Sequence, residues 1–345
     1  MSLSIQVFGI VELELARGYA FCGPPALKQN RASKTANDGN GDVTSKVSNR
    51  PAGSRGHGKD QAVRLDPRLN AYRSDIAARM LEGKVDSRRF VQGEAFQVTA
   101  PAAPLRRLPS SRAGLDSEVL FGERVMLYDV AEGWAWVQLE RDGYVGYLPS
   151  QALTRHLHQA THRVAAIGTF VYPAADIKAP PVASLSMNAM LCVTDAVGQF
   201  LKLAGGGYVI ARHAADLAHP ALDFVEIAER FIGTPYLWGG RTRLGLDCSG
   251  LVQVALEAAG KAAPRDSDMQ QQGLGDTVLV PADLEGLRRG DLIFWPGHVG
   301  IMTDGTFLLH ANAKHMATAI ETLQEANSRM TNSGAALSAI KRITL

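Results

Sequence analysis

The chain has 345 residues, of which 46% are hydrophobic and 20% are charged, and its formal net charge at pH 7 is +2. A single hydrophobic core rarely grows past about 250–300 residues, so this length predicts more than one domain. The small net charge argues against nucleic acid or an anionic membrane as a partner, and no apolar run approaches the roughly 18 residues of a membrane span.

Residues 1–62 carry no pattern of a folded element. The first 27 residues are fairly apolar, but Glu12 and Glu14 interrupt them and no basic region precedes them, which argues against a secretory signal. Residues 28–62 are rich in Asn, Ser, Gly, Lys and Arg, and this composition predicts a disordered segment. The three cysteines have no paired spacing, which favours a reducing compartment. We therefore predict a cytoplasmic protein, with a secreted or periplasmic location as the alternative.

The next segment, 63–94, is predicted to be a helical arm that docks on a domain. Four apolar side chains are spaced as on one face of a helix: Leu65, Leu69, Ile76 and Met80.

Two stretches of short β-branched and aromatic runs follow, at residues 95–157 and 158–218. Gly and Pro punctuate the runs, as in small barrels of short strands. The segment GWAWVQLERDGYVGYLP in the first stretch has a fainter counterpart, GQFLKLAGGGYVIA, in the second, at a constant offset of 64 residues. We predict a duplicated β module that resembles bacterial SH3-like barrels, with one irregular β domain as the alternative.

From residue 219 onward, apolar residues at helical spacing replace the short β-branched and aromatic runs. The run FVEIAERFIG predicts a helix that ends at Gly233, and SGLVQVALEAAG predicts a second that ends at Gly260. The strand-like runs DLIFW, HVGIMT and TFLLHA come later. Helices first and antiparallel strands second predict an α+β domain over 219–345.

Cys248 lies directly before the second predicted helix, with Asp247 as its expected cap. The first turn of a helix lowers the pKa of a thiol through its unpaired N–H groups and the helix dipole, which makes Cys248 a candidate nucleophile. The alternative is a buried structural thiol, because free cysteine is among the most buried residue types.

A thiol nucleophile needs an imidazole within reach, and His298 and His310 lie in successive predicted strands. They share a sheet face if the connection at Asp304 and Gly305 spans three residues or carries a bulge. They face apart if the connection is a two-residue turn. His315 is expected at the surface.

Four segments in order resemble the NlpC-type family of papain-like cell-wall cysteine peptidases over about residues 230–315: GTPYLWGGRTRLGLDCSG, PRDSDMQ, GDLIFWPGHVGIMT and LLHANA. The barrels ahead of them resemble the subgroup that cuts murein peptides between γ-linked D-Glu and the diamino acid. The resemblance implies an α+β papain-like cysteine peptidase domain preceded by two small SH3-like β-barrels. It also implies Cys248 as nucleophile, His298 as general base and then acid, and His310 as the residue that orients His298. No cofactor or metal is implied.

The resemblance also implies a site for a free amine. Asp247, together with an acid and a tyrosine of the first barrel, would hold the N-terminal amine of the substrate's L-Ala. Asp116 and Tyr144 are the best-placed equivalents in the barrel, with Glu118 and Tyr147 as alternatives.

Further residues would line the cleft. Ser249, Arg265 and Asp266 match the positions around the γ-Glu and the diamino acid, although Arg265 and Asp266 could instead form a structural ion pair. The backbone N–H of Cys248 is a natural oxyanion donor, with the Tyr236 hydroxyl as a second. Trp238 matches the cleft wall, whereas Trp295 is expected in the core.

These features predict a cytoplasmic cysteine endopeptidase that hydrolyses the γ-D-glutamyl-L-diamino acid bond of short murein peptides with a free N-terminal L-Ala, in cell-wall peptide recycling. One alternative is a secreted hydrolase of intact peptidoglycan. Others are a non-catalytic wall-peptide binding protein and an enzyme that transfers the acyl group to an acceptor other than water. The sequence does not indicate the diamino acid or the oligomeric state.

Overall fold

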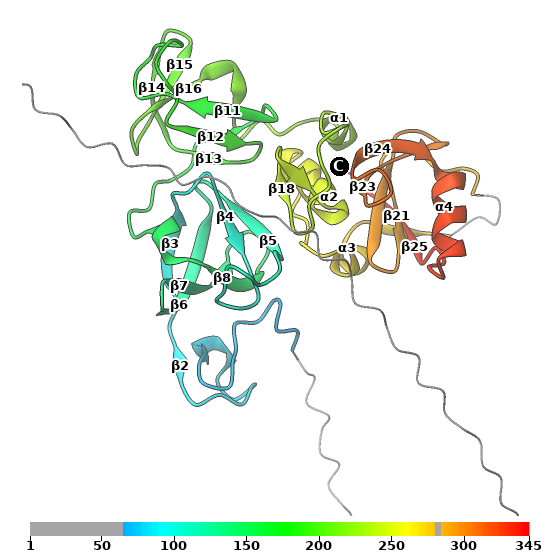
Figure 1. Ribbon diagram of the computed structural model, residues 1–345, viewed down its shortest axis with the longest axis horizontal. Coiled ribbons are helices and arrows are strands. Elements are labelled where there is room, and N and C mark those ends of the chain that lie inside the picture. The colour runs from blue at the N-terminus through cyan, green and yellow to red at the C-terminus, as the bar shows by residue number, and fades with distance from the viewer. Residues whose placement is uncertain (1–64, 280–283, 345) are drawn as a thin grey trace, which may run out of the picture. The chain divides into compact units, whose positions relative to one another are not determined.

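The computed structural model describes residues 65–279 and 284–344 (Figure 1). The segment 1–62, predicted to be disordered, lies outside the described residues. Two strand-rich modules and a C-terminal mixed domain follow one another along the chain. No helix in the described part is long and apolar enough to cross a membrane.

The prediction of a helical arm over 63–94 is wrong. The described part of this segment holds one 3-10 turn and two short parallel strands: η1 Arg79–Leu81, β1 Ala77–Ala78 and β2 Phe90–Val91. Its start is held in a turn by Asp66, whose carboxylate accepts from the Arg68 backbone N–H at 2.8 Å. Ile76 is fully buried with Trp136 in one cluster, whereas Met80 is 70% exposed. The apolar residues are buried by packing on the first barrel, so their spacing needs no helix.

The first module is a small antiparallel barrel with a five-stranded sheet in the order β8-β7-β6-β3-β9 and a separate β4-β5 hairpin. Buried aliphatic side chains from all these strands form its core. Its elements are β3 Glu94–Val98, β4 Ala102–Leu105, β5 Ser117–Leu120, β6 Arg124–Ala131, β7 Trp134–Leu139, β8 Val145–Pro149, the 3-10 turn η2 Ser150–Ala152 and β9 Leu153–Thr154.

The second module repeats this order of elements around a core of its own. The meander β14-β15-β16 corresponds to β6-β7-β8, and β17 pairs with β10 as β9 pairs with β3. The strands therefore form two modules and not one irregular domain. The elements are β10 His162–Val164, β11 Gly168–Val171, β12 Ala183–Ser186, β13 Met190–Leu191, β14 Val193–Val197, β15 Phe200–Leu203, β16 Tyr208–Ile210, η3 Ala211–His213 and β17 Ala214–Asp216.

The C-terminal domain has a six-stranded antiparallel sheet in the order β20-β25-β21-β22-β23-β24. Helices and strands together confirm the predicted α+β class. The elements are α1 Phe224–Glu229, β18 Arg241–Thr242, β19 Gly245–Leu246, α2 Cys248–Ala258, α3 Ser267–Gly273, β20 Asp276–Val278, β21 Asp291–Trp295, β22 His298–Met302, β23 Phe307–Asn312, β24 Ala317–Thr322, α4 Leu323–Asn332 and β25 Ala339–Arg342.

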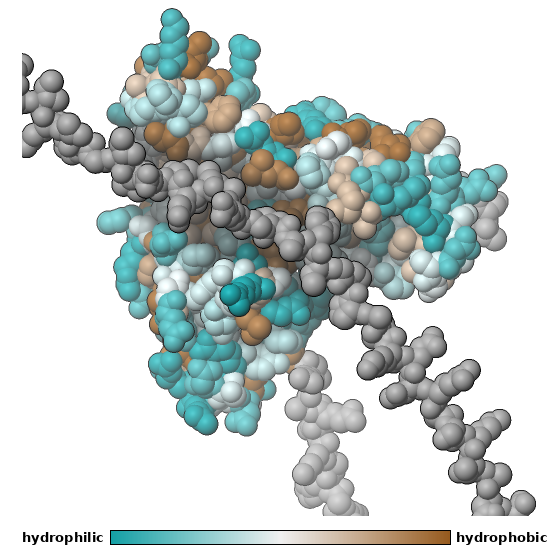
Figure 2. Space-filling view, in the orientation of Figure 1, coloured by the Kyte–Doolittle hydropathy of each residue, from teal (hydrophilic) through white to brown (hydrophobic). Residues whose placement is uncertain are grey.

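Each face of this sheet has its own cluster of buried side chains. Leu292 and Phe294 of β21 pack with α1 and α2, whereas Ile293 and Trp295 pack with Ala326 of α4. Successive side chains of a strand point to opposite faces, so β21 contributes to both clusters. On the face of the molecule drawn in Figure 2, apolar side chains lie in small groups between polar ones.

Candidate active site

Cys248 is the first residue of α2, and Asp247 is its N-cap. The Asp247 carboxylate accepts a hydrogen bond from the Gly250 backbone N–H at 2.6 Å, which confirms the predicted cap. Gly250 also lets the helix start lie against the chain at Gly240, since a Cβ at Gly250 would be 2.3 Å from the Gly240 carbonyl oxygen. This packing fixes the backbone that carries the thiol.

The pKa of Cys248 differs from the prediction made from its helix position. Burial raises the pKa of the thiol to about 12, and the neighbouring Asp247 carboxylate raises it further. Backbone N–H groups of Val299 and Ser249 oppose this rise without cancelling it. The predicted lowering is therefore wrong, because desolvation of a side chain in a residue only 7% exposed outweighs the helix start. The resting nucleophile is a neutral thiol.

His298 and His310 lie side by side on the sheet. The strand register pairs Met302 with Leu308, which leaves residues 304–306 as a three-residue connection. This is the arrangement predicted to place both histidines on one face. The atoms His298 Nε2 and His310 Nδ1 are 2.8 Å apart.

A carboxylate stands behind the two histidines. Glu321 Oε1, at the end of β24, is 2.8 Å from His310 Nε2. Arg329 of α4 and Lys314 also donate to Glu321, and they lower its pKa to about 2 against the effect of its burial. Glu321 was missed by the sequence reasoning. Its only local signal is the capping box of Thr322 and Glu325 directly after it, which marks the end of a strand.

The hydrogen bonds determine which ring nitrogens carry protons. An ionised carboxylate can only accept, so His310 donates from Nε2 to Glu321 and keeps an acceptor at Nδ1. His298 then donates from Nε2 to His310, which leaves His298 Nδ1 as the free acceptor. Burial lowers the pKa of His298 to about 3 and that of His310 to about 4, so both rings are neutral. Neutral His298 can therefore take a proton from Cys248.

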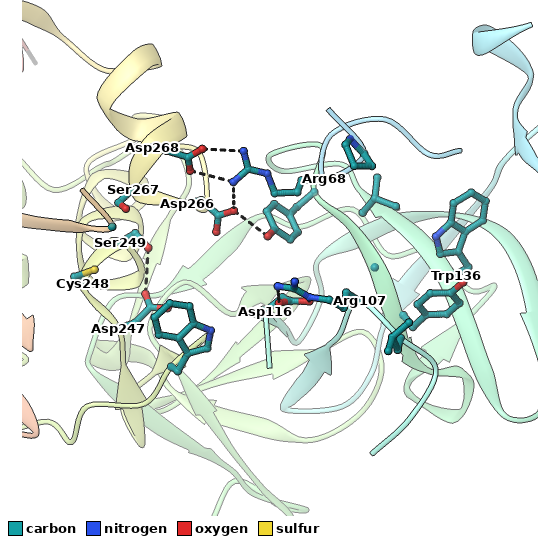
Figure 3. Close-up of a pocket in the computed structure, with 18 of the residues that line it drawn as sticks. Arg68, Arg107, Asp116, Trp136, Asp247, Cys248, Ser249, Asp266, Ser267 and Asp268 are labelled. Carbon is teal, nitrogen blue, oxygen red and sulfur yellow. Dashed lines mark hydrogen bonds and ion pairs between the residues drawn. The ribbon is translucent and has the colours of Figure 1, made fainter. Parts of the chain in front are cut away.

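A pocket of about 740 Å³ opens at the thiol and extends to the first barrel (Figure 3). Gly297, next to His298, is part of its lining. The structure brings eight of the predicted site residues together in this lining: Cys248, Asp247, Ser249, Asp266, Tyr236, Trp238, Asp116 and Tyr144.

Arg265 does not reach this pocket and is a correction to the predicted cleft. Its side chain is 1% exposed, and its guanidinium donates to Asp247 at 2.6 and 3.0 Å and to Ser249 at 2.9 Å. A third donor, Nε, binds Ser117 of the first barrel at 3.1 Å. The predicted alternative of an ion pair with Asp266 is also not formed, because Asp247 takes that place. Arg265 therefore stabilises Asp247, the N-cap residue of α2.

The candidate amine-binding residues of the first barrel differ in whether they line the pocket. Asp116 lines the pocket and is paired with Arg107 at 2.7 Å, whereas Glu118 binds the Arg241 backbone N–H outside it. Tyr144 donates its hydroxyl to Asp266 at 3.0 Å. Of the two predicted pairs, Asp116 and Tyr144 are therefore the better placed.

Tyr147, the alternative tyrosine, lines the pocket with its hydroxyl accepting from Arg73 at 2.9 Å. Arg73 belongs to the segment before the first barrel, and so does Arg68. The Arg68 guanidinium bridges three carboxylates at 2.8 Å, as Figure 3 shows in part. They are Asp66, Asp266 and Asp268. Sequence reasoning missed these arginines because the pocket residues that they bind, Asp266, Asp268 and Tyr147, are far away in the chain.

The remaining aromatic and histidine positions have distinct environments. Tyr236 is half-buried, and burial beside Cys248 raises the pKa of its hydroxyl to about 12. The hydroxyl has no hydrogen-bond partner among the described residues. Trp238 is 67% exposed at the pocket, whereas Trp295 is buried in the core as predicted. His315 is exposed, as expected.

Two family models match the chain. The model described as "NlpC/P60 family" matches residues 233–334, and the one described as "Bacterial dipeptidyl-peptidase Sh3 domain" matches residues 105–153. The second match covers β4 to η2 of the first barrel.

Two curated relatives each match more of the chain than either family model does. Gamma-D-glutamyl-L-lysine dipeptidyl-peptidase of Bacillus subtilis is 27% identical over 235 residues, which is 61% of this chain and 77% of the relative. Dipeptidyl-peptidase 6 of Lysinibacillus sphaericus is 27% identical over 252 residues, which is 66% of this chain and 91% of the relative.

A solved structure agrees with the fold. An NlpC/P60 family protein from Bacillus cereus has a TM-score of 0.61 at 19% identity, and covers 72% of this chain and 99% of that chain. Its likeness extends across the modules and the C-terminal domain. Together, the matches show that the chain contains an NlpC/P60 cysteine peptidase domain of papain-like fold, with a bacterial SH3-like domain ahead of it.

Proposed function

We propose that this chain is a cysteine endopeptidase that hydrolyses the γ-D-glutamyl-L-diamino acid bond of short murein peptides with a free N-terminal L-Ala, in cell-wall peptide recycling. Relatives named gamma-D-glutamyl-L-lysine dipeptidyl-peptidase support the bond and the substrate class. One observation carries the proposal: the thiol of Cys248 and the acid Asp116 of the barrel line the same pocket.

The first chemical step is attack by the thiol. Nδ1 of His298 takes the proton from Cys248 as Sγ forms a bond to the γ-carbonyl carbon of D-Glu. The resulting imidazolium gives this proton to the amine of the diamino acid as the C–N bond breaks. Water then gives a proton to His298 and attacks the thioester, and the proton returns to Sγ as the acid product leaves.

The oxyanion needs donors beside Cys248. The backbone N–H of Cys248 lies in the first turn of α2, where no intrahelical partner exists for it. The Tyr236 hydroxyl is the second donor, because it lies near Cys248 and has no other partner among the described residues. Its raised pKa keeps this hydroxyl protonated at neutral pH.

The charges of the pocket suit an ammonium group. Asp266 and Asp268 line the pocket and share the guanidinium of Arg68 with Asp66, so these carboxylates carry more charge than the one arginine that binds them. Among the described residues, Arg107 is the only hydrogen-bond partner of the Asp116 carboxylate, and the Arg107 side chain is 77% exposed. The Asp116 side chain is only 9% exposed, so a substrate ammonium can take the place of the solvent-exposed guanidinium and keep this carboxylate paired.

Asp247 has a different role from the one the resemblance implied. Its two oxygens already accept from the guanidinium of Arg265 and from the backbone N–H groups of Gly239 and Gly250. We therefore assign the ammonium to Asp116 and Asp266, with Asp247 holding the helix start in place.

Mass spectrometry of L-Ala-γ-D-Glu-diaminopimelate incubated with the protein tests this proposal. The expected result is cleavage to L-Ala-γ-D-Glu and diaminopimelate, its loss in Cys248→Ala, and no cleavage of an N-acetylated copy of the peptide. A lysine-containing peptide run in parallel identifies the diamino acid. No cleavage of any peptide would overturn the proposal and favour peptide binding or acyl transfer.

A second candidate is the hydrolysis of intact peptidoglycan by a secreted enzyme. The observation that favours it is that the pocket lining continues past Asp116 to Trp136, which leaves space beyond the position assigned to the amine (Figure 3). Equal cleavage of the N-acetylated peptide would support this candidate. A cytoplasmic location belongs to the first proposal, and fractionation of cells that produce the protein distinguishes the two.

A further inference from the structure

We propose that Glu321 is a positioning residue of the catalytic centre, held as a carboxylate by Arg329 and Lys314 so that it orients the protons of His310 and His298. The inference depends on cysteine peptidase chemistry and not on the murein substrate proposed above. It extends the catalytic centre to β24, where Glu321 lies, and to α4, which carries Arg329.

A continuous line of short contacts leads from the pocket to Glu321. His298 Nε2 is 2.8 Å from His310 Nδ1, and His310 Nε2 is 2.8 Å from Glu321 Oε1. His310 is 1% exposed and Glu321 is 7% exposed, so water cannot freely replace either partner. The tilted ring of Trp295, 5.9 Å from that of His298, restricts the first imidazole. The geometry therefore connects Glu321 to the base through one intermediate ring.

An acceptor is required at this position. Because Glu321 can only accept, it fixes the proton of His310 on Nε2, and His310 in turn fixes the proton of His298 on Nε2. A glutamine would have its amide oxygen drawn to Arg329 and Lys314 and would present its NH₂ group to His310. Both rings would then reverse, and His298 would carry its proton on Nδ1 towards Cys248. A base with that nitrogen protonated cannot accept the thiol proton.

The two cations have a separate effect. A buried glutamate alone would favour an imidazolium at His310, but Arg329 lowers the pKa of both His310 and His298. The other charged or titratable groups that face these rings are Asp247 and His315. Arg329 and Lys314 together carry more charge than Glu321, so the carboxylate orients the rings without charging them.

Alkylation of Cys248 tests the inference without a substrate. The purified protein is treated with iodoacetamide across a pH series, and peptide mass spectrometry follows Cys248 beside Cys192, a partly exposed free thiol in the same molecule. We expect Glu321→Gln to slow the alkylation of Cys248 at least about tenfold near neutral pH, since general-base assistance is worth about 10²–10⁴-fold. Cys192 should react as in the wild type.

Two further variants separate positioning from folding. Glu321→Asp keeps an acceptor and should recover part of the rate. Glu325→Gln removes a neighbouring carboxylate that closes the capping box of α4, and it should leave the alkylation of Cys248 unchanged. Arg329→Gln should move the acid limb of the alkylation profile of Cys248 upward by about one pH unit, towards the ordinary histidine value, because the pKa of His298 rises.

Histidine NMR gives a test that needs no variant. Nitrogen chemical shifts of the wild type should show His298 and His310 each protonated on Nε2 and not on Nδ1. The opposite tautomers, or wild-type alkylation of Cys248 in folded Glu321→Gln, would overturn the inference. Failure to cleave murein peptides would count against the proposed function alone, because neither of these measurements uses a substrate.

Discussion

The two β modules share an order of elements and both contact α2 near its C-terminal end, the first through Arg141 and Glu257 at 3.1 Å, but they differ in their relation to the pocket. Residues of the first module line the pocket at the N-terminal end of α2, where Cys248 lies. Of the described residues in 158–218, none lines this pocket. The second module instead donates to carbonyls near the other end of α2, from Arg163 to Ala258 at 2.8 Å and from Asn188 to Val254 at 2.9 Å.

This difference teaches how a duplicated module can acquire two uses. A small barrel has side chains that its apolar core does not use, so one copy can present Asp116, directly before β5, while the other presents Arg163 from the strand β10. Helix C-termini carry unpaired carbonyls and partial negative charge, and a guanidinium stabilises both. The first module therefore belongs to the pocket, and the second supports the helix that carries the nucleophile.

The largest expected effect comes from breaking the junction of the first module with the catalytic domain. Arg241, which is fully buried, binds Glu257 at 2.6 Å, Glu123 at 3.3 Å and the Glu118 carbonyl at 3.0 Å. Removing one partner of a buried ion network costs about 3–5 kcal/mol because charges remain unpaired. Arg241→Met should therefore lower the free energy of unfolding by about this amount in urea titrations.

A matched control lies on the surface of the same module. Arg155 pairs with Glu94 while 74% exposed, so Arg155→Met should cost less than about 1 kcal/mol. Equal losses in Arg241→Met and Arg155→Met would mean that the buried network does not hold the junction.

The next effect concerns the amine. Asp116→Asn removes the carboxylate that we assign to the substrate ammonium, and a lost charged hydrogen bond is worth about 1.5–3 kcal/mol. We expect KM for L-Ala-γ-D-Glu-diaminopimelate to rise about 10- to 100-fold with little change in kcat. The exposed Asp195 of the second module supplies the control, and Asp195→Asn should leave KM unchanged.

The third effect concerns the second module, where we expect a change in the free energy of unfolding and none in KM. Arg163→Met removes the hydrogen bond to Ala258 and should lower the free energy of unfolding by about 1–2 kcal/mol, while KM stays the same. Arg212, exposed on the same module, gives the control variant Arg212→Met, which should change neither quantity. An altered KM in Arg163→Met would show that the second module contributes to substrate binding after all.

The sequence predicted those parts that local chemistry determines. Cys248 with Asp247 could be recognised because a helix start has a capping pattern, and the two barrels because their repeat survives at a fixed spacing. Ile76 was misassigned to a helix because its burial comes from Trp136, which is distant in the chain. Glu321 was missed because nothing near it in the sequence reveals His310 as its partner.

The other wrong predictions concern buried side chains, because the spacing of residues in the sequence does not indicate how deeply a side chain is buried. Cys248 was expected to have a lowered pKa from its place in the helix, yet its enclosure raises the pKa. Arg265 matched a cleft position in order along the chain, but its side chain is buried behind the pocket lining, where it binds Asp247 and Ser117. The places of Cys248 and Arg265 along the chain were therefore predictable from the sequence. The direction in which each side chain points and its exposure to solvent were not.

The smallest expected effect tests whether Asp116 of the first module binds the substrate ammonium. Arg107 pairs with Asp116 in the free enzyme, and only the Arg107 side chain is exposed. A substrate ammonium therefore has to displace an ion pair worth about 1 kcal/mol, the upper value for exposed pairs. Arg107→Gln should therefore lower KM for the free-amine peptide by up to about fivefold, whereas Arg112→Gln on the same loop should not. A higher KM in Arg107→Gln would mean that the guanidinium binds a substrate carboxylate and does not compete with the amine. The direction of the change in KM therefore decides whether Asp116 binds the substrate ammonium directly or positions Arg107 for a substrate carboxylate.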